Sequence, residues 1–383
     1  MKTNHLKLLE TFGQSVWLDY LRRDLITRKE LQKLIFNDGL KGITSNPTIF
    51  ESALANSYEY DDDIKSLTLE GKDVNYIYES IIMTDIKSAA DEFRQLYNIS
   101  QGKEGFVSLE VNPHLAYDTS GTIEEARHLW NSVNRPNIFI KVPATDEGLP
   151  AIQQLTSEGI NVNVTLLFGL PRYRQVAEAY IDGIKSRIEN GNPVKNITSV
   201  ASFFLSRIDS EIDPKEEDYV ALGGEQVHFA TNIKGQVAIS SAKMASSIYK
   251  EIFESKEFNI LESHGATPQK LLWASTGTKN PDYSDIKYID SIIGKNTINT
   301  IPPDTLKAYR DHGNPSPRLE THLERACWVM SELPELGIDI DLVAKKLEND
   351  GVEKFIKSFD KLMETLTKKS QQILYNEHRR PNL

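Results

Sequence analysis

Cysteine is almost absent from this chain of 383 residues, which contains Cys327 alone. A single thiol excludes any disulfide within the chain and favours a reducing compartment, so we expect a cytoplasmic protein. The N-terminal residues contain no long apolar run of the signal-peptide kind, which agrees with that expectation. Cys327 lies in an apolar helical stretch without a neighbour that would stabilise a thiolate, and we expect it to be buried and inert.

Two further features are missing, a long hydrophobic run and an excess of basic residues. No stretch approaches the roughly 20 apolar residues that a membrane-spanning helix needs. Lys and Arg total 44 against 55 Asp and Glu, a formal net charge of −11. This balance argues against general binding to nucleic acids or anionic membranes. Any phosphate site must therefore be a local cluster of basic side chains.

Metal-binding motifs are also missing. The eight histidines include no H-E-x-x-H pair and no other close spacing typical of metal ligands. We therefore expect no metal site in this protein.

The chain does contain a regular alternation of short apolar runs and amphipathic stretches. Eight runs have the length of a strand: Val16–Tyr20, Gly42–Asn46, Phe106–Val111, Ile138–Val142, Ile160–Leu167, Val200–Leu205, Lys270–Ala274 and Thr297–Ile301. Between them apolar residues recur at helical spacing, as at Ile82, Ile86, Ala90 and Phe93. This alternation predicts an α/β protein with a parallel sheet covered by helices, and eight units fit a single closed (β/α)8 TIM barrel. An open, doubly wound sheet is the alternative, although no G-x-G-x-x-G and no P-loop motif follows any run.

We expect one barrel domain over residues 1–383, with additional segments that flank it. Residues of about 1–13 are predicted to form an extra N-terminal helix, and residues of about 317–378 extra C-terminal helices. The polar segment of about 209–231 is predicted to be an inserted loop.

Polar residues interrupt four of the apolar runs, each toward its C-terminal end. They are Asp19, Glu110, Lys141 and Asn163. For one such residue, contact with solvent at a strand end is an ordinary explanation. The set is more specific, because barrel enzymes place their active sites at the carboxyl ends of the strands.

The chemistry of these side chains is complementary. Lys141 is flanked by Ile138, Phe139, Ile140 and Val142, and desolvation disfavours the charged form of such a lysine, which frees a nucleophilic amine. This amine can attack a ketone to give a Schiff base, in which the protonated nitrogen acts as electron sink for cleavage of a neighbouring C–C bond. The reaction needs an acid and a base, for which Asp19 and Glu110 are candidates. It needs no metal, and we expect no cofactor.

Five segments resemble the transaldolase family. They are Ile43–Phe50 (ITSNPTIF), Ile138–Thr145 (IFIKVPAT), Asn161–Phe168 (NVNVTLLF), Ser202–Asp209 (SFFLSRID) and Trp273–Gly277 (WASTG), and the resemblance extends from about Gln14 to Pro303. The chain length is similar to that of the longer transaldolase subgroup.

The resemblance implies transfer of a dihydroxyacetone unit between sugar phosphates, with a role for each matching residue. Lys141 would form the imine, Asp19 would take the C4-hydroxyl proton, and Glu110 with Thr165 would shuttle protons. The remaining residues would bind the substrate: Asn46, Asn163 and Ser202 along the three-carbon unit, and Arg207, Ser275 and Lys279 at the phosphate.

One departure from the family concerns the phosphate. Other transaldolases often carry an arginine just after the serine of the seventh strand, whereas this chain offers Lys279 further along the loop. The charge is kept but the bidentate geometry of arginine is lost. The alternative is that Lys279 is a solvated loop residue. Phe204 is predicted to pack in the core, although the resemblance also allows it to shape the pocket.

Three functions remain in competition. The first is a transaldolase, and the second is an aldolase that uses the same lysine but releases dihydroxyacetone. The third is a barrel that only binds sugar phosphates, which is disfavoured because Lys141, Asp19 and Glu110 are all present. In each case the partners are small sugar phosphates, without nucleic acid or membrane, and we expect a monomer or a homodimer.

Overall fold

Eight parallel strands form a closed barrel in the order of the sequence. The computed structural model describes residues 4–222 and 227–378. The strands are β1 (Gln14–Asp19), β2 (Gly42–Thr44), β3 (Phe106–Glu110), β4 (Ile138–Pro143), β5 (Val162–Leu167), β6 (Ser199–Phe204), β7 (Lys270–Ala274) and β8 (Thr297–Ile301). Because β1 pairs with β8, the sheet has no edge, so the predicted (β/α)8 barrel is confirmed and the doubly wound sheet is excluded.

Almost every strand residue is buried, since side chains of a barrel point either into its interior or toward the surrounding helices. At the amino-terminal end of the barrel the rings of Trp17, Phe106 and Phe139 pack together, with centroids 4.6 to 6.4 Å apart. Gly42 of β2 leaves room for this cluster, because a Cβ there would lie 2.5 Å from the Trp17 ring. The aromatic cluster closes one end of the barrel, and the polar strand residues lie toward the other.

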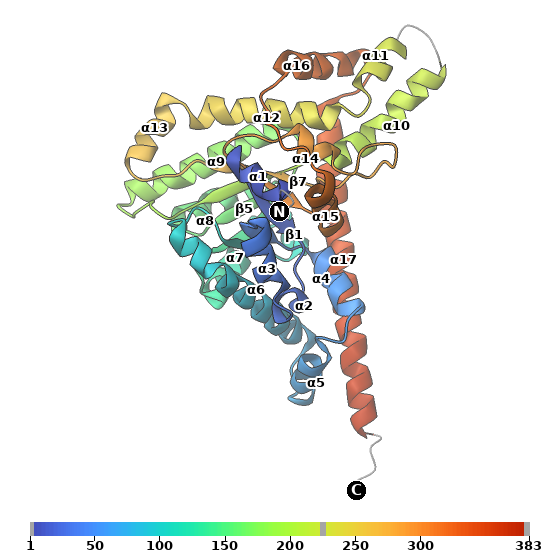
Figure 1. The fold of residues 1–383 in the computed structure, drawn as a ribbon. Helices are drawn as coiled ribbons and strands as arrows, with labels where there is room; N and C mark the ends of the chain where they lie inside the picture. Colours follow the sequence, from blue (N-terminus) through green and yellow to red (C-terminus); the bar gives the residue numbers. More distant parts are fainter. Residues whose placement is uncertain (1–3, 223–226, 379–383) are drawn as a thin grey trace.

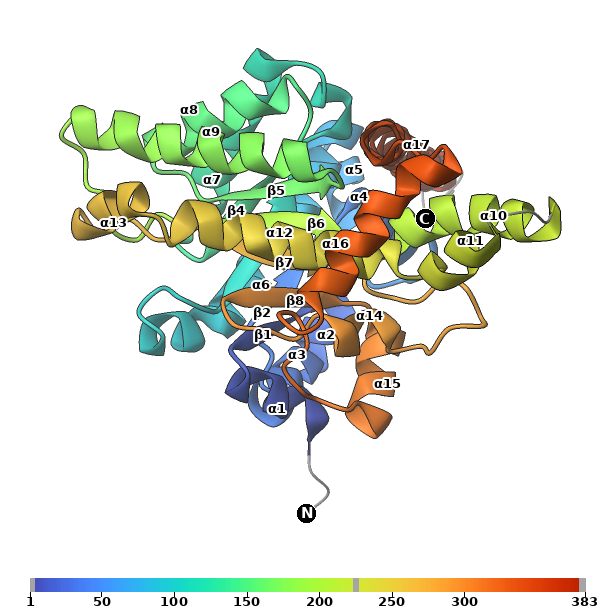
Figure 2. The same cartoon turned by 90° about the horizontal axis from the view of Figure 1, so that it is seen from above.

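Helices surround the barrel on all sides in the view from above (Figure 2). Those between the strands up to β6 are α2 (Arg23–Thr27), α3 (Glu30–Lys33), the π-helix η1 (Leu34–Asp38), α4 (Pro47–Ala55), α5 (Asp61–Leu69), α6 (Val74–Ile99), the 3-10 helix η2 (Pro113–Leu115), α7 (Thr119–Val133), α8 (Gly148–Glu158) and α9 (Leu170–Glu189). Those that follow β6 are α10 (Ser206–Leu222), α11 (Val227–Ile233), α12 (Val237–Phe253), α13 (Lys256–Ser263), α14 (Lys287–Ser291) and α15 (Pro303–His312).

Side-chain caps define where several of these helices begin. Asp73, Asp118 and Ser255 each accept a hydrogen bond from a backbone N–H of the first turn of α6, α7 and α13. Such caps satisfy donors that have no partner within the helix. The helix boundaries therefore follow local sequence signals.

The expected inserted loop of about 209–231 is a correction, because most of the segment is helical. It contains most of α10 and the first part of α11, while residues 223–226 lie outside the described part of the chain. The polar character that suggested a loop has a tertiary explanation. Asp209 accepts hydrogen bonds from the Ala238 backbone N–H and the Tyr288 hydroxyl, and Asp213 from the Gly235 N–H. These buried carboxylates fasten α10 to α12 and α14.

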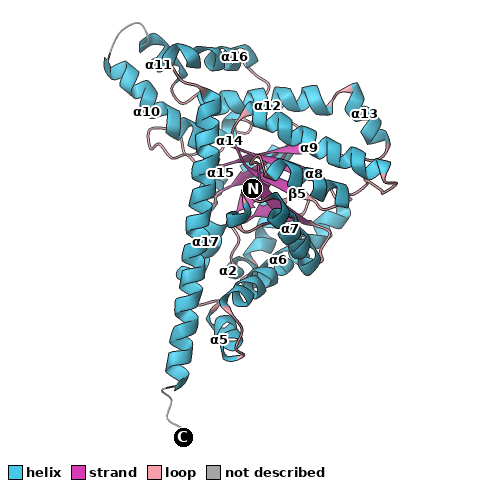
Figure 3. Ribbon diagram, turned by 180° about the vertical axis from the view of Figure 1, so that it is seen from behind, coloured by secondary structure: helices cyan, strands magenta, loops and turns pink. Residues whose placement is uncertain are grey.

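Flanking helices are present at both ends of the chain. Residues 5–11 form α1 (His5–Thr11), and the C-terminal region contains α16 (Leu323–Glu332), the 3-10 helix η3 (Leu333–Leu336) and α17 (Ile340–His378). The 39-residue α17 runs along one side of the molecule (Figures 1 and 3) and packs against α4, α5, α6 and β5. A helix more than 200 residues from the first strands in sequence thus lies beside the carboxyl ends of the strands.

Cys327 is exposed, so the expectation of a buried thiol is wrong. Ala326 and Val329 form the buried face of α16, and Cys327 follows Ala326 by one residue, about 100° further around the helix. Its Sγ contacts Met244 Sδ at 3.7 Å. None of the helices in residues 4–222 and 227–378 is both long and apolar enough to cross a membrane.

Candidate active site

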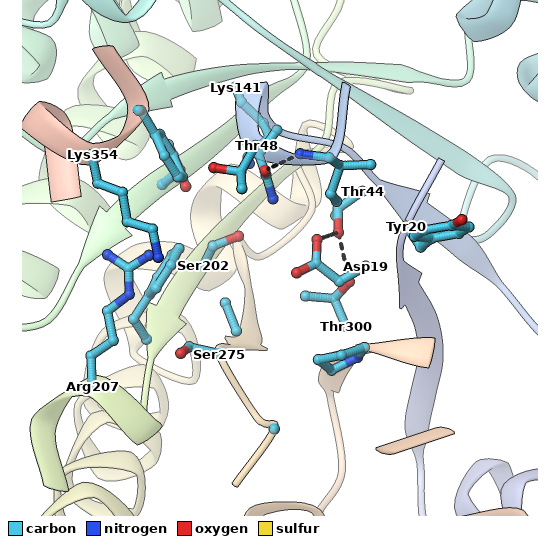
Figure 4. A pocket seen from close by; sticks show the side chains of 18 of the residues that line it. Asp19, Tyr20, Thr44, Thr48, Lys141, Ser202, Arg207, Ser275, Thr300 and Lys354 are labelled. Carbon is cyan, nitrogen blue, oxygen red and sulfur yellow. Dashed lines mark hydrogen bonds between the residues drawn. The ribbon is translucent and has the colours of Figure 1, made fainter. Parts of the chain in front are cut away.

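A cavity of about 650 Å3 opens at the carboxyl ends of the strands. It is lined by eight of the ten residues predicted to form the site: Asp19, Asn46, Lys141, Thr165, Ser202, Arg207, Ser275 and Lys279. Figure 4 shows several of them extending from different strands toward a common space. Closure of the barrel therefore brings together residues that span 260 positions of sequence between Asp19 and Lys279.

Lys141 lies at the centre of this arrangement and is buried. Its Nζ donates to the Ser45 carbonyl oxygen at 3.1 Å and to Glu110 Oε2 at 3.0 Å. The ring of Phe355, from α17, lies 6.0 Å from the same nitrogen. The amine is therefore held by two acceptors, one directly after β2 and one on β3, and an aromatic ring lies nearby.

Glu110 is directly opposite Lys141 in the register of β3 and β4 and lies beside the cavity rather than in its wall. Burial raises the pKa of its carboxyl, an effect that the nearby Lys141 ammonium opposes. Its second oxygen, Oε1, is buried without a protein partner. The carboxyl can thus hold a proton next to the lysine nitrogen.

Asp19 is the second carboxylate of the site and is half-buried. Thr44 donates a hydrogen bond to Asp19 Oδ1 at 2.8 Å, and Thr300 lies 2.7 Å from the same Thr44 hydroxyl. Because that hydroxyl has one hydrogen, it donates to Asp19 and accepts from Thr300. Burial raises the pKa of the Asp19 carboxyl. The positive charge of Lys141, the Thr44 hydrogen bond and Arg207 oppose part of this rise. These hydrogen bonds hold the side chain in one orientation, beside Thr44 and Thr300 (Figure 4).

Asn163 is completely buried and does not line the cavity. Its amide nitrogen donates to Ser108 Oγ at 3.0 Å, and its amide oxygen accepts from Ser202 Oγ at 2.6 Å. Asn163 therefore lies behind Ser202, which faces the cavity. Thr165 lies two residues after Asn163 on β5 and lines the cavity, and its Oγ1 has no protein partner.

Asn46 is the N-cap of α4, where its side-chain oxygen accepts from the Ile49 N–H at 3.1 Å. Pro47 at the first helical position favours this helix start, because its fixed φ suits a helix and it lacks an N–H that would need a partner. The cap uses the oxygen of the amide and leaves its nitrogen available at the cavity wall.

The opposite side of the cavity is basic. Arg207 is half-buried, and burial lowers the pKa of its guanidinium, while Asp19 and Asp350 act in the opposite direction. Its Cζ lies 5.5 Å from the Phe204 ring centre. Ser275 has a left-handed backbone with φ of 54°, and its Oγ lies 2.8 Å from Ser206 Oγ. Lys279 is exposed at the rim.

Comparison with known proteins assigns this arrangement to a family. Residues 16–366 match the model of the transaldolase/fructose-6-phosphate aldolase family. The chain belongs to this family. It is 45% identical to transaldolase 2 of Nostoc punctiforme, an alignment that covers 96% of the chain and 98% of that protein. Transaldolases of Thiobacillus denitrificans and Saccharopolyspora erythraea are 46% and 42% identical, with 94% and 97% of this chain and 99% and 100% of theirs aligned. The transaldolase resemblance and the transferase class predicted from the motifs are thereby confirmed.

The residues that α17 contributes to this cavity were not predicted from the sequence. Leu347, Asp350, Lys354 and Phe355 all line the cavity. These residues lie in the segment predicted only as extra C-terminal helices, because nothing in its local sequence indicates which surface those helices cover. Thr44 and Thr300, which orient Asp19, were missed because threonine is common in strands. Phe204, predicted to be a core residue, is nearly buried but also lines the cavity.

Proposed function

We propose that this chain is a transaldolase acting in the non-oxidative pentose phosphate pathway. It transfers a dihydroxyacetone unit from sedoheptulose 7-phosphate or fructose 6-phosphate to glyceraldehyde 3-phosphate or erythrose 4-phosphate. The observation that carries the proposal is the position of Lys141 Nζ, which is buried 3.0 Å from Glu110 Oε2, in a cavity that Asp19 also lines. A nucleophile, an acid and a base are the groups that a Schiff-base aldol reversal requires.

In the first half-reaction, Lys141 attacks the C2 carbonyl carbon of the donor and forms a C–N bond. Glu110 begins protonated and gives its proton to the carbonyl oxygen as the C–N bond forms. It then takes a proton from the carbinolamine nitrogen and passes it to the hydroxyl, so that water leaves and a protonated imine remains. The raised pKa of Glu110 supports this role, because a carboxyl that retains its proton can act as an acid. The unpartnered Glu110 Oε1 and Thr165 Oγ1 are suited to bind the water that carries the proton.

In the next step Asp19 takes the C4-hydroxyl proton and the C3–C4 bond breaks. The bonding electrons move into the imine to give an enamine, and the shortened aldehyde phosphate leaves. Asn46 and Ser202 hold hydroxyls of the three-carbon unit, and Asn163 orients Ser202 from behind. Attack of the enamine on the acceptor aldehyde reverses these steps, and hydrolysis of the new imine frees Lys141.

Borohydride trapping tests the proposal directly. The protein is incubated with fructose 6-phosphate and sodium borohydride, and the peptide that contains Lys141 is examined by mass spectrometry. We expect a reduced adduct of dihydroxyacetone on Lys141 and none in Lys141→Ala, with circular dichroism to show that the variant is folded. No adduct with the wild-type protein would contradict the Schiff-base mechanism.

A second assay separates transfer from simple cleavage. Fructose 6-phosphate is supplied alone and then with erythrose 4-phosphate. A transaldolase releases glyceraldehyde 3-phosphate steadily only when the acceptor is present. Equal steady turnover without an acceptor would favour the aldolase.

We further propose that the protein is cytoplasmic and works as a monomer or a homodimer on small sugar phosphates. The single exposed thiol supports a reducing compartment. Fractionation of cells and light scattering of the purified protein test these two proposals.

A further inference from the structure

The backbone of helix α17 lies close to residues on the basic side of the cavity. Gly351 is buried in α17, and a Cβ at this position would lie 2.8 Å from Leu166 Cδ2 and 3.4 Å from Arg207 Nη1. Leu347, Asp350, Lys354 and Phe355 surround Gly351 on the same helical face and line the cavity. The helix is thus seated directly above the basic side of the site.

Three cations converge there: Arg207 from α10, Lys279 from the loop after β7 and Lys354 from α17. Figure 4 shows the ends of the Lys354 and Arg207 side chains directed toward the same point. Desolvation lowers the pKa of Lys354, and the positive charges of Arg207 and Lys279 lower it further. Mutual repulsion of this kind identifies a place where the protein holds positive charge in excess.

No carboxylate of the described residues forms an ion pair with any of these three side chains. Asp350 and Asp19 influence Arg207 only at longer range. The other lysines of α17 differ in this respect, because each has an acidic partner within 4 Å. The pairs are Lys345–Glu348, Lys346–Glu211, Lys357–Glu353, Lys361–Glu51, Lys368–Glu364 and Lys369–Asp61. Lys354 is the exception, and it is the lysine of this helix that reaches the cavity wall.

We propose that Lys354 binds the substrate phosphate together with Arg207, and thereby supplies from the C-terminal helix a cation that complements Lys279. A phosphate dianion placed between these groups relieves their repulsion and accepts charge-assisted hydrogen bonds from them. The inference rests on the proposed function, since it assigns the phosphate end of that substrate. It also gives α17 a role, because removal of this helix would leave Arg207 and Lys279 as the only cations at this side of the cavity among the described residues.

Lys354→Met is the test variant, because methionine keeps most of the aliphatic side chain and removes the charge. Lys354→Arg keeps the charge, and Lys357→Met is the matched control one turn further along α17, where the lysine pairs with Glu353 outside the cavity. Three readouts are compared: KM and kcat with fructose 6-phosphate and erythrose 4-phosphate, inhibition by inorganic phosphate, and trapping of unphosphorylated dihydroxyacetone on Lys141 by borohydride.

We expect Lys354→Met to raise KM about tenfold and to weaken inhibition by phosphate by a similar factor, the effect of one lost hydrogen bond to a charged group. Dihydroxyacetone trapping should be unchanged, because this ketone has no phosphate. Lys354→Arg and Lys357→Met should behave nearly as wild type. Unchanged KM and phosphate inhibition in Lys354→Met would overturn the proposal, and so would an equal loss of dihydroxyacetone trapping, which would indicate general damage to the site.

Direct binding of inorganic phosphate, measured by calorimetry, separates this inference from the proposed function. Weaker phosphate binding in Lys354→Met supports the inference even if the wild-type protein fails to trap fructose 6-phosphate on Lys141. A failure of that trapping would contradict the Schiff-base proposal and would leave the inference about Lys354 unaffected.

Discussion

Glu110 Oε2 lies 3.0 Å from Lys141 Nζ, on the adjacent strand and at the same level of the barrel. Both side chains are buried, so neither can exchange its partner for bulk water without a large cost. Glu110 is therefore the group placed to exchange a proton with the Lys141 nitrogen, and a carbonyl is attacked by the neutral form of an amine.

Glu110→Gln should slow imine formation without preventing substrate binding. Glutamine keeps the shape of the side chain but cannot transfer a proton, so we expect kcat to fall by about 10²- to 10⁴-fold, the usual contribution of a general acid–base group. Single-turnover borohydride trapping with fructose 6-phosphate measures the rate of adduct formation. A wild-type trapping rate in this variant would show that another group moves the proton.

Asp19→Asn should separate imine formation from bond cleavage. The imine with the intact donor should still form, whereas C3–C4 cleavage should slow by a factor of about 10² to 10⁴ because no base remains for the C4-hydroxyl proton. Mass spectrometry of the trapped Lys141 peptide should then show the full six-carbon adduct in place of the three-carbon adduct. A three-carbon adduct in normal yield would contradict the role of Asp19.

The pH dependence of kcat should be bell-shaped. Asp19 must be ionised to accept a proton, and burial raises its pKa, so the rate should fall as pH decreases through a value above the ordinary one for aspartate. Glu110 must hold a proton, and burial raises its pKa as well, so the rate should fall as pH increases through that value. Asp19→Asn should remove the acidic limb. An acidic limb that persists in this variant would have another origin.

Gly351→Ala should impair phosphate binding without touching the catalytic groups. The added methyl group would lie 2.8 Å from Leu166 Cδ2, which must move, and 3.4 Å from Arg207 Nη1, where it restricts the positions open to the guanidinium. We expect a KM for fructose 6-phosphate raised several-fold, with dihydroxyacetone trapping retained, and Lys357→Ala on the same helix as the control. Crystallography of the variant with bound phosphate would show whether Arg207 has moved, and an unmoved Arg207 with normal KM would refute the steric argument.

Cys327 should react with a thiol reagent in the folded protein, because its side chain is exposed on α16. One thiol per chain should be titrated without denaturant, and the modified protein should remain active, since α16 does not line the cavity. Cys327→Ser should remove the reaction and leave kcat unchanged. A thiol that reacts only after denaturation would contradict this surface position.

The strands and their polar residues were predictable because the relevant signals are local. Apolar runs of strand length indicated eight strands, and charged or amide side chains near the ends of four of these runs indicated Asp19, Glu110, Lys141 and Asn163. The segment of about 209–231 was misread because Asp209 and Asp213 look like loop residues until their partners on α12 and α14 are known. Asn163 behaves similarly, since only the structure shows that its amide serves Ser202 from behind.

The sequence by itself determined the barrel and the family, and it singled out Lys141 as the proposed nucleophile, since these inferences depend on periodicity and on short contiguous motifs. The tertiary structure alone decided which surface α17 covers, that Lys354 faces Arg207, and that Cys327 is exposed. The physical reason is range. An amphipathic helix records in its sequence that one face is buried, but not against what, because that choice is made by packing between segments hundreds of residues apart.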